Sequence, residues 1–302
     1  MDVTRAWPLV LALSLAPIAC ADAGDRVVVG AKNFNEQTLL GEMVAQWIEA
    51  TTNIPVQRRF QLGGTFIAHR ALVAGDIDLY VEYTGTALTA ILERDPISDP
   101  VEVLRTVRQE YRHAWGLEVL DPLGFENTFA MLVRAGMADS LGLRTLSDLS
   151  SHARALRPGF GYEFMERDDG FRGLREAYGL QFATAPREMD LGLVYRALAT
   201  GKIDLTAGNS TEGKIEALHL RMLVDDRGYF PPYEAVIVVR PEAMEGHPGL
   251  RKALEALSGR IDTETMRSLN REVDVDGRDF AVVAHEWVES VLPAATAPPG
   301  SR

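Results

Sequence analysis

The chain has 302 residues, of which 46 % are hydrophobic and 25 % are charged, a composition typical of a globular protein and not of a disordered one. Its formal net charge is −12, so the surface should repel nucleic acid and gain nothing from an anionic membrane. The length is sufficient for two domains with hydrophobic cores of ordinary size.

The first 23 residues predict an export signal, which places the mature protein in the periplasm or elsewhere outside the cytoplasm. They contain one basic residue, Arg5, and an apolar run that is too short to span a membrane. Two processing routes stay open. Cys20, the only cysteine, lies where bacterial lipoproteins carry the acylated cysteine, whereas the small residues up to Ala23 are typical of ordinary cleavage. On either route we expect no disulfide, and a lipid on Cys20 would be the only membrane contact.

The mature chain begins with an apolar strand at residues 26–30, followed by a helix whose apolar residues recur at helical spacing. We expect Asn33 or Asn35 to cap this helix. Lys32 lies in the loop between strand and helix, beside the helix N-terminus, and this geometry favours anion binding.

A second strand at residues 56–62 leads into a turn with two glycines, after which Thr65 is expected to cap a helix. That helix ends in a phrase that the chain repeats, because Arg70-Ala-Leu-Val-Ala-Gly-Asp-Ile-Asp-Leu79 returns as Arg196-Ala-Leu-Ala-Thr-Gly-Lys-Ile-Asp-Leu205. In each copy a helix ends at a glycine suited to the left-handed cap, and a strand follows at once. The repeat predicts two similar α/β lobes.

A polar turn follows the strand of each copy, Tyr83-Thr-Gly-Thr86 in the first and Asn209-Ser-Thr211 in the second. Open α/β sheets hold their ligands at such strand ends. Two of these ends, facing each other across a cleft, would form a binding site between the lobes.

The order of the remaining elements predicts that the first lobe is discontinuous. A strand at 127–133 leads into the second lobe, and a strand at 235–239 returns to the first. The two crossings, near 124–129 and 231–236, would form a hinge about which the lobes close. Further helices are expected at 101–115, 146–149, 175–179, 250–257 and 280–291.

The predicted organisation is therefore an export signal followed by two lobes and a short tail. The ranges are 1–23 for the signal, 24–126 plus 236–292 for lobe 1, 127–235 for lobe 2, and 293–302 for a disordered tail.

Six phrases, in order along the mature chain, resemble the substrate-binding proteins of ABC importers for glycine betaine, choline and carnitine. They are Gly30-Ala-Lys-Asn-Phe-Asn-Glu-Gln37, Leu62-Gly-Gly-Thr65, Asp78-Leu-Tyr-Val-Glu-Tyr-Thr-Gly-Thr86, Glu163-Phe-Met-Glu-Arg-Asp-Asp-Gly170, Phe230-Pro-Pro-Tyr233 and Ile261-Asp-Thr-Glu-Thr-Met-Arg-Ser-Leu-Asn270. The resemblance implies a two-lobed periplasmic-binding-protein fold of type II, known as a Venus flytrap. It also implies capture of a small zwitterion and delivery to a membrane permease that a separate ATPase drives.

The resemblance assigns two halves to the site. In betaine binders of this family a Lys, a Thr and an Arg hold the carboxylate, and the matching residues here are Lys32, Thr86 and Arg167. Aromatic rings surround the quaternary ammonium, which has no N–H to donate and is attracted to π-faces. The matching residues on that side are Tyr83, Tyr233 and Phe129, the last at a position that is often Tyr.

Asn209 departs from the family, because betaine binders place a Tyr there. Two interpretations stay open: the cage lacks one wall, or the ligand is not betaine. Losing one aromatic face costs on the order of 1–2 kcal/mol, which binding can survive. Asn209 also supplies a donor and an acceptor, and these suit a ligand with a further polar group or with N–H groups, such as a modified amino acid. Choline fits less well, since it offers Lys32 and Arg167 no carboxylate.

The same residues also have plainer interpretations. Arg167 can form a surface ion pair with Asp168, Asp169 or Glu163, and a Lys on a loop such as Lys32 is usually just exposed. Phe129 lies in a strand and can belong to the core. Four further tyrosines are expected to be core aromatics: Tyr80, Tyr162, Tyr178 and Tyr195.

Nothing in the sequence predicts an enzyme, a cofactor or a metal site. The six histidines are scattered, and no nucleophile elbow is present. Asp274, Asp276 and Asp279 resemble a calcium loop, but their spacing is wrong for an EF-hand, and we interpret them as a solvated turn. Two alternatives of other classes stay open: an exported enzyme with an unrecognised site, and a ligand-sensing domain that signals to a partner and feeds no transporter.

Overall fold

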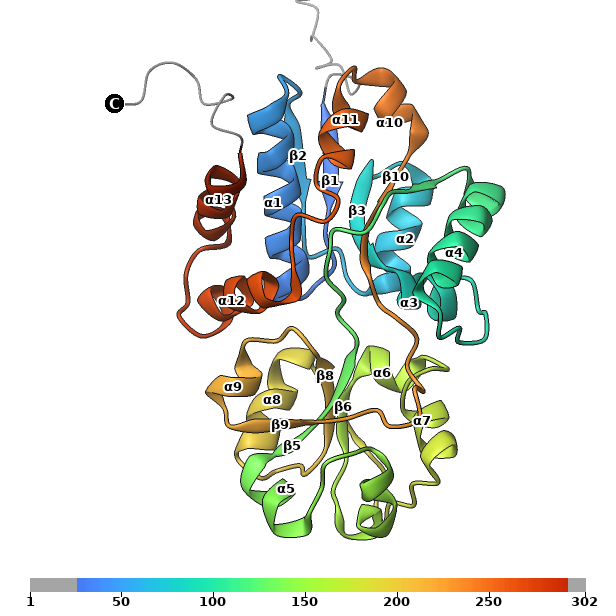
Figure 1. Ribbon diagram of the computed structural model, residues 1–302, viewed down its shortest axis with the longest axis vertical. Helices are drawn as coiled ribbons and strands as arrows, with labels where there is room; N and C mark the ends of the chain where they lie inside the picture. The colour runs from blue at the N-terminus through green and yellow to red at the C-terminus, as the bar shows by residue number, and fades with distance from the viewer. Residues whose placement is uncertain (1–25, 293–302) are drawn as a thin grey trace, which may run out of the picture.

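Two α/β lobes make up the computed structural model, which describes residues 26–292 (Figure 1). Lobe 1 contains β1 (Val27–Gly30), α1 (Asn35–Thr51), β2 (Val56–Arg59), α2 (Thr65–Ala74), β3 (Leu79–Tyr83), α3 (Thr84–Thr86), a π-helical turn (Ala87–Ile91), α4 (Pro100–Trp115), β4 (Glu118–Val119), β10 (Ala235–Val239), α10 (Pro241–Gly246), α11 (Leu250–Glu255), α12 (Thr263–Asp274) and α13 (Phe280–Val291). Lobe 2 contains β5 (Phe129–Arg134), α5 (Ala135–Leu141), two 3₁₀ turns (Ser147–Ser151, Ala153–Ala155), β6 (Gly159–Gly161), α6 (Tyr162–Glu166), α7 (Phe171–Tyr178), β7 (Arg187–Met189), α8 (Leu191–Ala199), β8 (Thr206–Asn209), α9 (Lys214–Ala217) and β9 (Leu220–Leu223).

The sheet of lobe 1 has the order β2-β1-β3-β10-β4. Strands β1, β2 and β3 are parallel, and β10 runs antiparallel between β3 and β4. All five residues of β10 are buried apolar residues, as expected for a strand covered on both faces. Helix α1 packs with α11, α12 and α13, while α2 and α4 contribute to a separate apolar cluster, so helices cover both faces.

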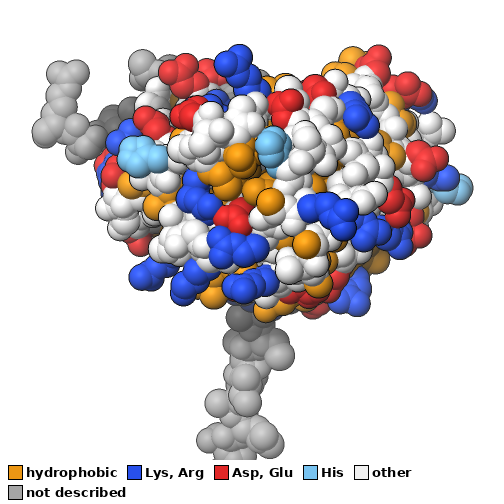
Figure 2. Space-filling view, turned by 90° about the horizontal axis from the view of Figure 1, so that it is seen from below, with side chains coloured by type: hydrophobic (Ala, Val, Ile, Leu, Met, Phe, Trp, Pro, Cys, Tyr) orange, Lys and Arg blue, Asp and Glu red, His pale blue; other side chains and the backbone are white. Residues whose placement is uncertain are grey.

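Lobe 2 has an antiparallel sheet with the order β8-β5-β9 and a parallel pair, β6-β7. A single bridge between Pro158 and Leu205 joins the two. Basic side chains gather on part of the end of lobe 2 that faces away from lobe 1, although the chain as a whole is acidic (Figure 2).

The sequence repeat is a structural repeat. Gly75 and Gly201 each lie just after a helix, and their φ angles are positive, 78° and 72°. The aspartate three residues after each glycine joins its strand to a neighbouring segment: Asp78 bonds the backbone N–H of Val28 at 2.8 Å, and Asp204 that of Arg157 at 3.1 Å. The two copies thus build the same helix–strand unit, one in each lobe.

The chain passes between the lobes through two segments that pair with each other. Glu126 and Glu234 form an antiparallel bridge, and Asn127 donates its backbone N–H to the Tyr233 carbonyl at 3.0 Å. These segments lie where the sequence predicts the two crossings.

Several predicted helix starts differ in detail. Phe34 is the N-cap of α1 and no side chain caps it, so the prediction of Asn33 or Asn35 is wrong. Gly64 caps α2, and Thr65 is the first helical residue, which frees its hydroxyl for other contacts. The segment predicted as a helix at 146–149 is a 3₁₀ turn at Ser147–Ser151. The predicted export signal, Cys20 and the tail at 293–302 lie outside the described residues.

Candidate ligand-binding site

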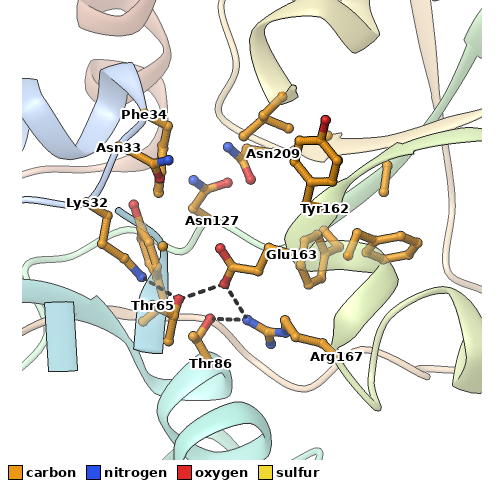
Figure 3. Close-up of a pocket in the computed structure, with 18 of the residues that line it drawn as sticks. Lys32, Asn33, Phe34, Thr65, Thr86, Asn127, Tyr162, Glu163, Arg167 and Asn209 are labelled. Atoms are coloured by element: carbon orange, nitrogen blue, oxygen red, sulfur yellow. Dashed lines mark hydrogen bonds and ion pairs between the residues drawn. The ribbon is translucent and has the colours of Figure 1, made fainter. Parts of the chain in front are cut away.

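A pocket of about 580 Å³ lies between the lobes (Figure 3). Its volume falls in the range of small-molecule sites, roughly 300–1,000 Å³. Seven residues singled out from the sequence all line it: Lys32, Tyr83, Thr86, Phe129, Arg167, Asn209 and Tyr233. The fold thus brings together side chains from both lobes that lie far apart in the sequence.

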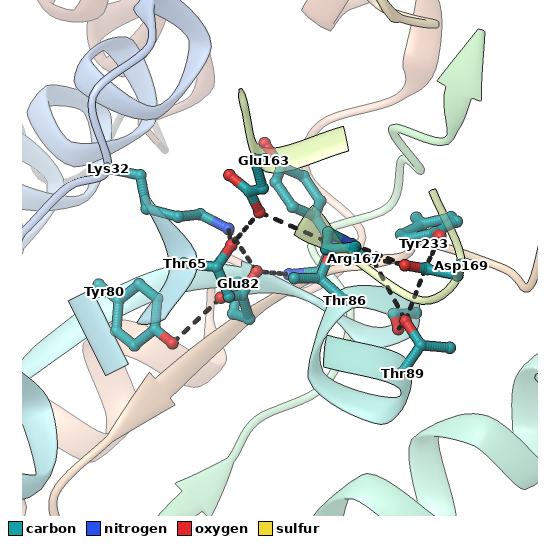
Figure 4. Close-up of polar contacts among 12 residues, drawn as sticks. Lys32, Thr65, Tyr80, Glu82, Thr86, Thr89, Glu163, Arg167, Asp169 and Tyr233 are labelled. Carbon is teal, nitrogen blue, oxygen red and sulfur yellow. Dashed lines mark hydrogen bonds and ion pairs between the residues drawn. The ribbon is translucent and has the colours of Figure 1, made fainter. Parts of the chain in front are cut away.

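Arg167 is buried, and its guanidinium is held by Asp169 through two hydrogen bonds of 2.7 and 2.6 Å (Figure 4). The interpretation of Arg167 as half of a surface ion pair is therefore wrong about its exposure, although Asp169 is indeed a partner. Burial alone would lower the pKa of Arg167, but hydrogen bonding to Asp169 raises it above its ordinary value. The remaining nitrogen, Nη1, lies 3.2 Å from Thr86 Oγ1 and so reaches across to lobe 1.

Lys32 is also buried, which the expectation of an exposed loop lysine did not foresee. Its Nζ lies 2.5 Å from a carboxylate oxygen of Glu82, which is fully buried, and 3.4 Å from Thr65 Oγ1. The charge of Lys32 is therefore balanced within the protein, and its ammonium stays at the pocket wall.

Glu163 lies in the middle of the pocket in Figure 3. Its Oε1 accepts a hydrogen bond from Thr65 Oγ1 at 2.7 Å and lies 3.5 Å from Arg167 Nη1. A carboxylate thus sits on donors from both lobes, where the resemblance would place the carboxylate of a ligand.

The aromatic residues of the pocket form a connected group. The rings of Phe129 and Tyr233 lie 5.8 Å apart, and the guanidinium of Arg167 lies 5.0 Å from the Phe129 centroid. Lys32 Nζ lies 5.0 Å from the centroid of Tyr83, and Phe34 is a further ring on the wall.

The tyrosines that the sequence places in the core divide into two groups. Tyr80 and Tyr178 are buried away from the pocket, as expected. Tyr162 is 55 % exposed and lines the pocket, so the prediction is wrong for it, and buried Tyr195 also contributes to the wall. The hydroxyl of Tyr195 accepts the backbone N–H of Asn209 at 3.2 Å. Asn209 itself lies on the wall, near Tyr162 in Figure 3.

A second charged group lies at the Asn209 end of the pocket and joins the lobes. Lys214 Nζ lies 2.9 Å from Glu212 and 3.2 Å from Asp274 of α12. Burial, followed by the charge of Asp274, raises the pKa of Glu212 to about 7. The side chain of Asp274 is 2 % exposed, so its interpretation as part of a solvated turn is wrong.

Other site residues were missed in the sequence because each has an ordinary structural explanation. Thr65 looks like a helix cap, Glu163 like an ion-pair partner, and Asn127 like a strand residue. Glu36 is the exception. Glu36 lies in the first turn of an apolar helix and is buried, and a buried carboxylate needs polar partners. The spacing of the apolar residues in that helix could have predicted that Glu36 is buried.

Within residues 26–292, no cluster of three or more His, Cys, Asp or Glu is arranged to hold a metal ion. None of the helices in this part of the chain has the length and apolar character needed to cross a membrane.

Comparison with known proteins shows the family. The model for the substrate-binding domain of the ABC-type glycine betaine transport system matches residues 25–290. An ergothioneine transport permease/ergothioneine-binding protein of Helicobacter pylori is 37 % identical over 87 % of this chain, which spans 47 % of that relative. A carnitine transport binding protein of Listeria monocytogenes is 32 % identical, with coverage of 93 % and 94 %.

A solved structure described as a glycine betaine/carnitine/choline ABC transporter gives a TM-score of 0.73 at 37 % identity, covering 87 % of this chain and 98 % of the other. Proteins of this kind are extracytoplasmic, bind small ligands and work with a permease and an ATPase. The chain belongs to the substrate-binding proteins of ABC importers for ligands of the glycine betaine, carnitine and choline type.

Proposed function

We propose that this pocket binds a zwitterion with a quaternary ammonium, a carboxylate and a further polar group. The observation that carries the proposal is the convergence of carboxylate donors from both lobes, Lys32 and Thr86 from one and Arg167 from the other, on a single pocket lined by aromatic rings. A ligand that touches both lobes binds the closed form better and therefore favours closure.

The carboxylate end is assigned to Thr86, Arg167 and Lys32, with Thr65 as an added donor. Thr86 accepts a hydrogen bond from Arg167, and its own proton is bonded to none of the described residues, so it is available to a ligand. Arg167 supplies a charge whose orientation Asp169 fixes.

The ammonium end is assigned to Tyr83, Phe129 and Tyr233, which line the pocket. Asn209 takes the place of one wall, and Tyr162 stands on the same side of the pocket. This arrangement supplies aromatic rings, beside which Lys32 and Arg167 also lie, and the hydrogen-bonding amide of Asn209.

Two ligands of this class are specific candidates. Glycine betaine carries only the ammonium and the carboxylate, and carnitine carries a hydroxyl as well. Ergothioneine, a modified amino acid, adds a ring with N–H groups, and its candidacy rests on Asn209 and on the Helicobacter pylori relative named for it. We favour ergothioneine, because Asn209 offers groups that glycine betaine cannot use.

Parallel calorimetric titrations with glycine betaine, carnitine, choline and ergothioneine test this proposal. We expect micromolar or tighter binding of ergothioneine, equivalent to about −8 kcal/mol or better, and weaker binding of glycine betaine. Binding of choline alone would refute the carboxylate assignment. Tightest binding of glycine betaine would refute the role of Asn209.

We further propose how the protein works around this site. Lobe 1 (24–126 plus 236–292) and lobe 2 (127–235) would close about the paired crossings and present the closed form to the permease, without catalysis. The mature protein would act in the periplasm, and a lipid on Cys20 would tether it; mass spectrometry of the processed N-terminus distinguishes this route from cleavage after Ala23.

A further inference from the structure

Glu36 is a fully buried carboxylate at the start of α1, with no cationic side chain bonded to it among residues 26–292. Leaving a carboxylate unpaired in the interior is costly unless hydrogen bonds compensate. Glu36 accepts four of them, from Tyr83, Asn127, Thr211 and Asn270. Burial raises the pKa of Glu36, and these four hydrogen bonds oppose that rise.

The two carboxylate oxygens have different partners. Oε1 accepts the Tyr83 hydroxyl at 2.6 Å and the Asn127 amide at 2.7 Å, and both of these residues line the ligand pocket. Oε2 accepts the amide of Asn270 at 2.6 Å and the hydroxyl of Thr211. One side of the carboxylate thus faces the site, and the other faces the contact between the lobes.

Thr211 belongs to lobe 2, whereas Glu36 and Asn270 belong to lobe 1. The Asn270 amide also donates to the Thr211 carbonyl at 2.9 Å, so Glu36 and Asn270 of lobe 1 both bond Thr211. Thr211 lies two residues after Asn209, in the polar turn at the end of β8. Separation of the lobes must break both contacts and leave Oε2 with one partner fewer.

On the pocket side, Glu36 determines which groups a ligand meets. Tyr83 points its O–H at Glu36, so its hydroxyl proton is turned away from the ligand. Asn127 points its N–H₂ at Glu36, and its Oδ1 is bonded to none of the described residues. A quaternary ammonium accepts no hydrogen bond, so donors aimed at it would go unsatisfied. Gathering these donors on Glu36 leaves the ring of Tyr83, with its hydroxyl proton turned away, for the cation.

We propose that Glu36 is a positioning residue that couples closure to completion of the site: its carboxylate captures Thr211 of lobe 2 while holding Tyr83 and Asn127 with their donors turned from the pocket. This inference rests on the proposed function for its ligand, but the capture of Thr211 does not depend on which ligand binds.

The test uses Thr211→Val, which removes the captured hydroxyl and keeps the shape of the side chain. Thr206→Val is the matched control, because Thr206 is also fully buried in lobe 2 and its hydroxyl bonds only within its own strand. Single-molecule fluorescence transfer reports closure between dyes on Val101→Cys and Val224→Cys, exposed positions in lobes 1 and 2, in a Cys20→Ser chain.

We expect T211V to open about tenfold faster than T206V, with or without ligand, and to bind the ligand about tenfold more weakly, or about 1.4 kcal/mol. The free energy of unfolding of the two variants should be similar. Equal opening rates would overturn the proposal. If no tested zwitterion closes the unaltered protein, the proposed ligand class fails, and the opening rates of transient closures without ligand still decide the role of Thr211.

Glu36→Gln tests the other side of the carboxylate. Its amide keeps one acceptor and adds a donor, so it cannot accept all four hydrogen bonds. In a folded variant we expect the preference for glycine betaine over 3,3-dimethylbutanoate, its uncharged-headgroup isostere, to fall about tenfold. T206V should keep the preference of the unaltered protein. An unchanged preference in E36Q would refute the pocket-side role.

Discussion

At the residue scale, the site contains more charge than a zwitterion needs. Lys32 and Arg167 are balanced by Glu82 and Asp169, so Glu163 adds an uncompensated negative charge beside the donors. A ligand carboxylate must either share these donors with Glu163 or displace it. Repulsion between like charges then opposes binding, more strongly inside a pocket than in water.

Replacing Glu163 with Gln should therefore strengthen binding of carboxylate ligands, by roughly threefold to tenfold, equivalent to about 1 kcal/mol. Calorimetric titration measures the gain. Glu166→Gln removes the same charge from an exposed residue of the same helix, which lines the pocket but bonds none of the donors, and should give a smaller gain. Weaker binding by E163Q would mean that Glu163 contacts the ligand favourably instead of competing with it.

Asn209 provides the second residue-scale prediction. Asn209→Tyr adds an aromatic face and removes an amide, so glycine betaine should bind up to about tenfold more tightly, a gain of up to about 1.4 kcal/mol. Ergothioneine should bind more weakly. The ratio of the two affinities, measured by competition, checks the prediction, and a ratio equal to that of the unaltered protein would contradict the placement of Asn209 beside the ligand.

At the element scale, the two copies of the helix–strand repeat differ in the ion pairs that their aspartates form. Asp204 binds Arg157 at 2.7 Å and Arg134 at 2.6 Å, whereas the cation nearest to Asp78, Arg240, lies 3.7 Å away. Burial opposes the shift, but the hydrogen bonds from Arg157 and Arg134 lower the pKa of Asp204 to about 2. The second copy therefore depends more on its aspartate.

Asp204→Asn should lower the free energy of unfolding by about 1–3 kcal/mol near neutral pH, and Asp78→Asn by less, because only Asp204 loses two close ion pairs with arginines. The folded-state pKa of Asp204 lies below its usual 3.8, so this stabilisation is present above about pH 4 and is lost as pH falls towards 2. Chemical denaturation at pH 7 and pH 3 checks both points. Equal losses for D204N and D78N would contradict the unequal support.

The elements that could be predicted from sequence are those fixed by local pattern. The strand at 235–239 and the helix at 280–291 are confirmed with those bounds. The strand is an unbroken run of apolar residues, and the apolar residues of the helix recur at helical spacing, so the local pattern alone predicts each element. The caps of α1 and α2 were predicted wrongly, because the side chain of Asn35 bonds Asp274 of α12 in the same lobe, and that of Thr65 bonds Glu163 across the cleft. Tertiary contacts outweighed the local preference for capping.

The same limit applies to the candidate site. Its seven residues could be predicted to lie together, because family motifs mark them, and they do line one pocket. The pairing of Arg167 with Asp169 could be predicted, because the two residues share one motif, but the burial of this pair could not. Neither the burial of Lys32 nor its pairing with Glu82, fifty residues away, could be predicted, because both depend on how the first strands pack.

At the scale of the whole molecule, Lys214 joins Glu212 of lobe 2 to Asp274 of lobe 1, and Tyr195 lies beside Lys214; the proposed closure would form this contact. Burial and the charge of Asp274 raise the pKa of Glu212 to about 7, above its ordinary 4.5. A raised carboxyl pKa means that the closed form binds the proton more tightly. Closure is therefore favoured at low pH and loses this contribution as pH rises from about 4.5 to about 7.

Ligand affinity should accordingly fall between pH 5 and pH 7.5, by about threefold to tenfold. Glu212→Gln should flatten this dependence, because its amide does not titrate. Titrations of both proteins across this pH range make the comparison. A fall that persists unchanged in E212Q would assign the pH dependence to another group, such as Glu36.

The position of β10 also has a consequence for the order in which the chain folds. Lobe 2 draws its strands from one continuous stretch, so it can fold as soon as that stretch is available. Lobe 1 cannot complete its sheet until β10 inserts between β3 and β4, and α1 cannot be covered until α13 arrives. Contacts so distant in sequence form slowly. Residues 26–119 should therefore stay without a complete sheet until the last strand and helix of the lobe have been synthesised.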